Sequence, residues 1–152
     1  MKTLKTIVYW FIQCTWGCIC TTLGFLVFIC TCWFTEKRIY KGAVVSYIGH
    51  NWGGVNLGPF VFIYEEAKNY WVEDRRINEH EWGHSIQNLF WGPLQLFVID
   101  IPSAVRYWYR EFLQQYYWEK YINLPPYDAI WFEGQATAIG EKYRVEDSYW
   151  KN

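Results

Sequence analysis

Two histidines and a glutamate in the middle of the chain have the spacing of a metal site, in the segment His80-Glu81-Trp82-Gly83-His84. Residues four apart lie on one face of an α-helix, with Cβ atoms about 5–6 Å apart, so both imidazoles can bind one ion. Glu81 would lie beside the metal, where its carboxylate can take a proton from water that attacks a carbonyl group. The spacing therefore predicts His80 and His84 as ligands and Glu81 as the catalytic base. The alternative is a surface helix whose histidines are solvated or hydrogen-bonded.

A third protein ligand is needed, because catalytic zinc commonly has three protein ligands and one open position. We expect Glu133 to be this ligand, since it falls in the first turns of a predicted last helix. Asp100, an acidic residue within an apolar segment, is the alternative. His50 is interpreted as a hydrogen-bonded loop residue instead of a ligand. The expected cofactor is Zn²⁺, although iron, cobalt or manganese can occupy similar ligands.

The element that must position the two histidines is a helix from Val72 to Phe90. Charged residues come early in this segment, and a glycine and a proline that would stop a helix follow it. Glu133 requires a second helix, which we expect to begin with Asp128 as its N-cap and to run toward Arg144. The predicted site is therefore formed where two helices meet.

The combination of His-Glu-x-x-His with a distal Glu-x-x-Ala, here Glu133 to Ala136, resembles the gluzincin class of metallopeptidases. In that class one helix supplies two histidines and a second helix supplies the glutamate, so the resemblance implies the same three ligands. An edge strand near the site binds extended peptide by main-chain pairing in gluzincins. The segment Val55–Ile63 lies where that strand would be expected, with Pro59 as an interruption on one side.

A narrower resemblance runs over most of residues 50 to 136. The segments that carry it are Asn51–Gly58, His80–Gln87, Gly92–Leu94 and Ile101–Ser103. In these segments the chain is similar to a family of small bacterial membrane proteins with a His-Glu-Tyr-Gly-His-x-x-Gln motif, for which the activity is inferred. Trp82 stands where that motif has tyrosine. The resemblance supports the metal site more than it identifies a substrate. It implies a bacterial inner-membrane location, and the expected substrate is a peptide or protein.

The N-terminal part of the chain predicts a membrane anchor. No charged residue occurs from Ile7 to Phe34, and about 20 apolar residues are enough to cross a bilayer. We expect one long, tilted transmembrane helix, which is retained because no clean signal-peptide cleavage site follows a short apolar core. All five cysteines fall inside this stretch. They are expected to act as small apolar residues and not as disulfides or zinc ligands.

Two further segments are expected to complete the fold. Val44–Ile48 and Val55–Ile63 are β-branched apolar runs on either side of a glycine pair, which predicts a hairpin or a lone edge strand. Residues 93–109 are apolar but contain Asp100 and Pro102, which a lipid-exposed span would not favour. We expect residues 93–109 to be interfacial or re-entrant, with a full second span as the alternative.

Composition favours a membrane and argues against nucleic-acid binding. Trp, Tyr and Phe make up 22% of the 152 residues, and Trp and Tyr favour membrane interfaces. The aromatic segment Tyr107–Tyr121 suits an amphipathic helix on the bilayer surface. With 14 basic and 15 acidic side chains the net charge is −1, so no concentrated basic surface for nucleic acid is expected.

These features predict a mainly α membrane protein with a small β-hairpin. Residues 1–36 would form the transmembrane anchor, and residues 37–152 a zincin-like helical domain with the membrane-associated segment 93–109. The expected function is that of a membrane-anchored zinc metallopeptidase that hydrolyses peptide bonds, with the lipid bilayer as a partner. The alternative is a non-catalytic, metal-stabilised membrane scaffold or interaction protein, in which no position on the metal remains open.

Overall fold

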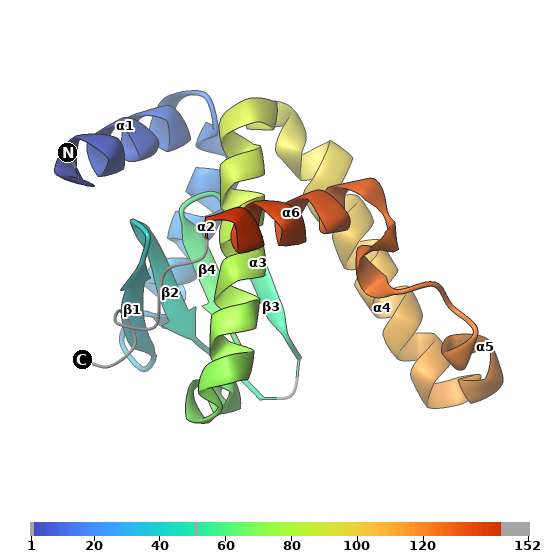
Figure 1. Ribbon diagram of the computed structural model, residues 1–152. Helices are drawn as coiled ribbons and strands as arrows, with labels where there is room; N and C mark the ends of the chain where they lie inside the picture. Colours follow the sequence, from blue (N-terminus) through green and yellow to red (C-terminus); the bar gives the residue numbers. More distant parts are fainter. Residues whose placement is uncertain (1, 51, 144–152) are drawn as a thin grey trace.

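The computed structural model describes residues 2–50 and 52–143, in which helices predominate around one small sheet (Figure 1). The helices are α1 (Lys2–Thr15), α2 (Cys18–Thr31), α3 (Trp71–Trp91), α4 (Ile101–Tyr116), α5 (Trp118–Ile122) and α6 (Trp131–Lys142). The strands are β1 (Glu36–Tyr40), β2 (Ala43–Tyr47), β3 (Gly54–Leu57) and β4 (Phe60–Ile63). Short 3₁₀ turns cover Glu65–Asn69, Gly92–Leu94 and Tyr127–Ala129, and a π-helical turn covers Leu96–Asp100.

The sheet has four strands, and the predicted hairpin across the glycine pair is wrong because β2 does not pair with β3. Its order is β1-β2-β4-β3, with β2 and β4 parallel and the two outer pairs antiparallel. The run Val55–Ile63 is not one strand, because the chain reverses at Gly58 and Pro59, and Gly58 has a φ of +65° that favours glycine. The charged segment Glu36–Tyr40 forms an outer strand that the apolar pattern does not reveal.

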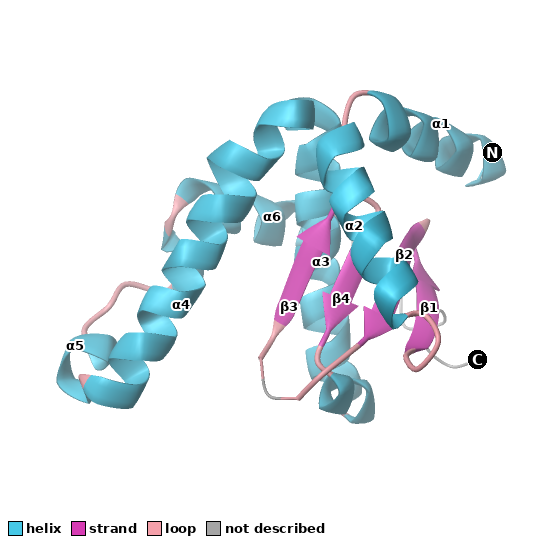
Figure 2. Cartoon of the chain, turned by 180° about the vertical axis from the view of Figure 1, so that it is seen from behind, coloured by secondary structure: helices cyan, strands magenta, loops and turns pink. Residues whose placement is uncertain are grey.

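The sheet lies between α2 and α3 (Figures 1 and 2). Alternate residues of β4 point to opposite faces. Phe60 packs against α2, with its ring centroid 5.4 Å from that of Phe28. Val61 and Ile63 belong to the core on the α3 side, which also contains Trp82. This core holds α3, and with it the two histidines, at a set distance from the sheet.

The expected single transmembrane helix is wrong, because α1 and α2 are separate helices. Within the described residues no single helix is long and apolar enough to cross a bilayer, and Leu4–Thr15 and Cys18–Thr31 meet that criterion only together, with a bend of 98° between them. Polar groups of α3 bind the chain at the bend. Asn88 donates to Gln13 Oε1 at 2.6 Å, and Gln13 donates to the carbonyl oxygen of Ser85 at 2.9 Å.

The metal-site helix is confirmed, since α3 runs from Trp71 to Trp91 and ends at Gly92, whose φ is +51°. Residues 93–109 form the turns after α3 and the first half of α4, which has proline in its first turn. The last helix begins at Trp131 and not at the predicted cap, because Asp128 lies in a separate 3₁₀ turn. Helix α6 ends at Lys142; Arg144, toward which the last helix was expected to run, and Asn51, which begins one segment of the family resemblance, lie outside the described residues.

Candidate metal centre

Helices α3 and α6 approach each other closely, and this contact positions the predicted ligands (Figure 1). A Cβ atom on Gly83 would lie 2.7 Å from the carbonyl carbon of Ala136 and 2.8 Å from its Cα, with the carbonyl oxygen nearer still. Gly140 of α6 approaches the backbone of Glu79 in the same way. Because side chains are missing at both contact points, the two backbones can lie against each other.

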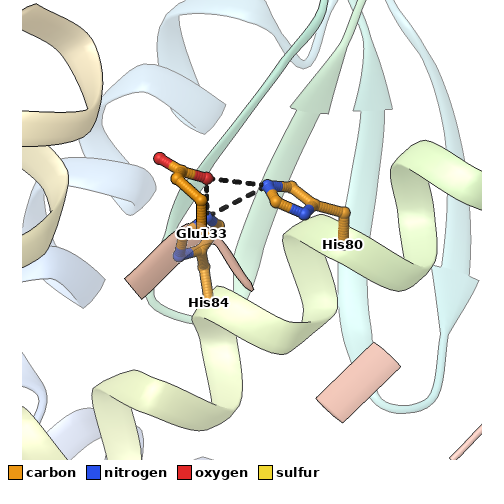
Figure 3. Close-up of side chains that lie close together, drawn as sticks. All are labelled: His80, His84 and Glu133. Carbon is orange, nitrogen blue, oxygen red and sulfur yellow. Dashed lines mark hydrogen bonds and ion pairs between the residues drawn. The ribbon is translucent and has the colours of Figure 1, made fainter. Parts of the chain in front are cut away.

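Three predicted ligand atoms meet at this crossing (Figure 3). The Nε2 atoms of His80 and His84 are 3.2 Å apart, and each lies 3.1 Å from Oε2 of Glu133. Two donors bound to zinc at about 2.0–2.1 Å with tetrahedral angles lie about 3.3 Å from each other. The triangle formed by the three atoms is therefore close to one face of a zinc coordination tetrahedron. The group could hold a metal ion.

Each ligand is held in place by a further polar side chain. Nδ1 of His84 lies 2.7 Å from Gln87 Oε1, and Nδ1 of His80 lies 3.0 Å from the hydroxyl of Thr137. The Ser103 hydroxyl donates to Oε1 of Glu133, which leaves Oε2 facing the histidines. Such contacts orient ligands and determine which ring nitrogen carries a proton.

The electrostatics of the triangle favour a cation. Glu133 is fully buried; this burial raises the pKa of its carboxyl, but hydrogen bonds with His80 and His84 outweigh it and hold the pKa well below its usual range. Burial lowers the pKa of His84, but the hydrogen bond with Glu133 and the charge of Glu81 raise it above its ordinary value. Three lone pairs that face one another need a proton or a metal ion between them, so these residues fit a metal.

Glu81 lies beside the triangle without forming part of it. Its side chain packs over the edge of the sheet, where a Cβ atom on Gly54 would lie 2.7 Å from Glu81 Oε1. Burial raises the pKa of the Glu81 carboxyl, while the charges of His80 and His84 act in the opposite direction. A carboxylate with a raised pKa is a better proton acceptor near neutral pH.

The other acidic and histidine candidates lie outside the triangle. Asp100 is hydrogen-bonded to Cys20 and Gln95, at 3.1 and 3.0 Å. Arg106, the nearest basic residue after Asp100 in the chain, donates to the main-chain oxygens of Pro126 and Tyr127 before the start of α6. His50 is exposed and lies 2.6 Å from Glu66 Oε1, which confirms a hydrogen-bonded loop histidine.

A cavity of about 860 Å³ opens onto the triangle. Its walls include the β3 segment 53–56, the face of α3 with Glu81, and residues of α4 such as Ser103 and Tyr107. Strand β3 is at the end of the sheet and pairs only with β4, so its other edge faces away from the sheet. The site therefore combines three ligand atoms, a buried carboxylate and one unpaired strand edge around a space large enough for part of a peptide.

None of the residues that support the predicted ligands was predicted as a site residue, although Gln87 ends the His-Glu-x-x-His-x-x-Gln motif. Gln87 follows His84 by three residues and Thr137 follows Glu133 by four, so each lies on the same helix face as its ligand neighbour. That spacing was an available signal. Ser103 reaches Glu133 from α4, and only the tertiary structure brings these two residues together.

Comparison with protein-family models, curated proteins and solved structures finds no match to this chain.

Proposed function

We propose that this chain is a zinc-dependent metallopeptidase held at a lipid bilayer. The observation that carries the proposal is the triangle of half-buried His80 with buried His84 and Glu133, which adjoins a large cavity together with Glu81. Two histidines and one glutamate form a donor set typical of catalytic zinc. A buried carboxylate next to such a set is the residue that peptide hydrolysis requires.

The chemistry divides between the metal and the chain. Held by His80, His84 and Glu133, zinc would act as a Lewis acid that polarises a substrate carbonyl group. Glu81 accepts a proton from the attacking water and can return it to the leaving amine, because its side chain lines the cavity beside the three ligands. Ser103, Thr137 and Gln87 keep the ligand side chains in one orientation during these steps.

The unpaired edge of β3 supports an extended peptide as the substrate. The main chain of residues 53–56 lines the cavity on the side of Glu81. An extended peptide can add to such an edge by main-chain hydrogen bonds. Pro59, which the sequence analysis treats as an interruption, lies in the turn between β3 and β4 and so leaves the β3 edge intact.

The cavity favours an enzyme over a metal-stabilised scaffold. Structural zinc sites are closed by four protein ligands, whereas catalytic sites have three and keep one position open. Among residues 2–50 and 52–143, the group that could hold an ion has three members. The adjoining cavity leaves room for water or substrate at a fourth position.

Exposed apolar side chains support the proposed membrane location. On α1, Leu4 and Phe11 are 66% and 67% exposed, and Leu26 on α2 is 54% exposed. Helix α4 adds a stripe of exposed apolar residues at intervals of three or four, namely Ile101, Val105, Trp108, Phe112 and Tyr116. Water is a poor solvent for such faces and a bilayer is a good one. A bacterial inner membrane, which the family resemblance implies, is the proposed compartment.

The proposal is tested with the metal content and the activity of the purified full chain. Elemental mass spectrometry should find about one zinc per wild-type chain and none in His84→Ala or Glu133→Ala. The wild type should cleave a mixed peptide pool, with products identified by mass spectrometry, and Glu81→Gln should keep its zinc but lose cleavage. Metal-free wild type would refute the site. Cleavage by Glu81→Gln at the wild-type rate would refute the proposed mechanism.

A further inference from the structure

Gln87 lies one turn beyond His84 on α3 and is 1% exposed. Its side-chain oxygen Oε1 faces Nδ1 of His84 at 2.7 Å. Its nitrogen Nε2 donates to the main-chain oxygen of Phe132 at 2.8 Å and to Gln135 Oε1 at 2.9 Å. Gln87 is absent from the cavity wall, so it contacts a ligand of the metal but does not reach a substrate.

The orientation of the Gln87 amide follows from its partners. The carbonyl oxygen of Phe132 can only accept a hydrogen bond, so the amide group that faces it must be the NH₂ end. The other end is then the oxygen, which can only accept. Nδ1 of His84 must therefore carry a proton and donate it to Gln87. In the neutral ring the lone pair is then on Nε2, where a metal ion can take it; without an ion, Nε2 shares a proton with Glu133 Oε2, 3.1 Å away.

The same side chain also fixes the start of α6. Phe132 directly precedes Glu133, so the bond from Gln87 to its main-chain oxygen ties the third ligand to the helix of the first two. His80 lacks an equivalent constraint, because its partner Thr137 is a hydroxyl that can either donate or accept. Gln87 is thus the contact that selects a ring tautomer.

From these contacts we infer that Gln87 is a positioning residue of the metal centre, which holds His84 in the tautomer that presents Nε2 to the ion. The inference rests on the proposed function, since it assigns a role within the same site. Metal-ligating histidines commonly donate their second nitrogen in this way, and loss of the partner typically weakens metal binding about 10–100-fold.

Three variants of the full chain test the hydrogen bonds of Gln87. Gln87→Met keeps the length of the side chain but removes all three hydrogen bonds, to His84, Phe132 and Gln135. Gln87→Glu keeps an acceptor for His84 and loses the donor to Phe132. Gln135→Ala is the matched control, because it removes a partner of the same amide while the bonds to His84 and Phe132 remain.

The first readout is ¹⁵N NMR of histidine side chains in metal-free protein at alkaline pH, where the rings are neutral. The chain has only three histidines, so the signals can be assigned by substitution. Nδ1 of His84 should carry a proton in wild type, Gln135→Ala and Gln87→Glu, whatever the state of Nε2, and should lose it in part of the molecules in Gln87→Met. A purely structural role would change stability but not the tautomer. A single Nδ1-protonated form in Gln87→Met overturns the inference.

The second readout is zinc affinity, measured by competition with a chromophoric chelator. Gln87→Met should bind zinc about 10–100-fold more weakly than wild type, whereas Gln135→Ala should match wild type and Gln87→Glu should recover most of the loss. Wild-type affinity in Gln87→Met contradicts the inference. If the wild type binds no zinc, the proposed function fails, and the NMR result alone decides the role of Gln87.

Discussion

Replacement of Gly83 by alanine is expected to separate α3 from α6 and so to prevent metal binding. In an isolated helix this change is favourable, since alanine stabilises a helix interior by about 1 kcal/mol over glycine. The expected sign here is the reverse, because the added methyl group meets the backbone of Ala136 and not a side chain that can rotate away.

The size of the effect follows from the contact distances. The new Cβ would lie 2.7 Å from the carbonyl carbon of Ala136 and closer still to its oxygen, whereas ordinary contact begins near 3.4 Å. The helices must therefore move apart by about 1 Å, a strain of about 1–3 kcal/mol in a packed interior. The same movement would stretch the 3.1 Å distances from Glu133 to the two histidines beyond the edge of a zinc tetrahedron.

The assay compares Gly83→Ala with wild type by urea unfolding, followed by tryptophan fluorescence, and by zinc content after dialysis. We expect the free energy of unfolding to fall and the bound zinc to drop to a small fraction of one equivalent. Gln135→Ala, on the exposed side of α6, serves as a control that should keep its zinc. A variant that is as stable as wild type and retains zinc would refute the claim that the Gly83 contact sets the ligand geometry.

Three further predictions concern the surroundings of the site. Asp100→Asn should retain wild-type zinc by elemental mass spectrometry, because Asp100 lies outside the triangle; a loss equal to that of Glu133→Ala would make Asp100 a ligand. Burial raises the pKa of the Asp74 carboxyl above its ordinary 3.8, although hydrogen bonds favour the charged form. The folded protein therefore loses stability as pH rises through the folded pKa and this carboxyl ionises. The unfolding free energy of wild type minus that of Asp74→Asn should therefore fall as pH rises from 3.8 through the folded pKa and then level off; a constant difference across urea titrations at several pH values would contradict this. Gln13→Leu should lower the free energy of unfolding by about 1–3 kcal/mol, because it leaves buried polar groups of α3 unpaired. Gln114→Leu, at an exposed position, is its control, and an equal effect of both changes would argue against the buried contact.

The part of the site that lies on one helix was predictable from the sequence. His80 and His84 share a helix face because of the fixed 3.6-residue repeat, and that repeat needs no knowledge of the rest of the chain. Glu133 was expected from its place in a second helix and from the gluzincin resemblance. The structure places its Oε2 beside both histidines, and it also shows that Asp100 faces Cys20 and Gln95 instead.

The N-terminal segment shows where the sequence pattern was insufficient. An uninterrupted apolar run indicates low affinity for water, but it does not indicate whether a helix continues or bends. The bend near Gly17 depends on Asn88 and other polar groups of α3, which are more than 70 residues away in the chain. The hairpin prediction was wrong for a related reason. Strands β2 and β4 are parallel neighbours in the sheet, although a loop and strand β3 lie between them in the sequence.

The sequence by itself determined the elements whose cause is local: the helix that carries the two histidines, the glycine that ends it, and the types of side chain available to bind a metal. Tertiary structure alone decided the close approach of α3 and α6 through Gly83 and Gly140, and the hydrogen bonds that Gln87 and Ser103 make to the ligands. The physical reason is the separation along the chain of the residues that interact. Helical periodicity acts over a few residues, whereas the direction in which a ligand points depends on contacts between segments that only the folded chain brings together.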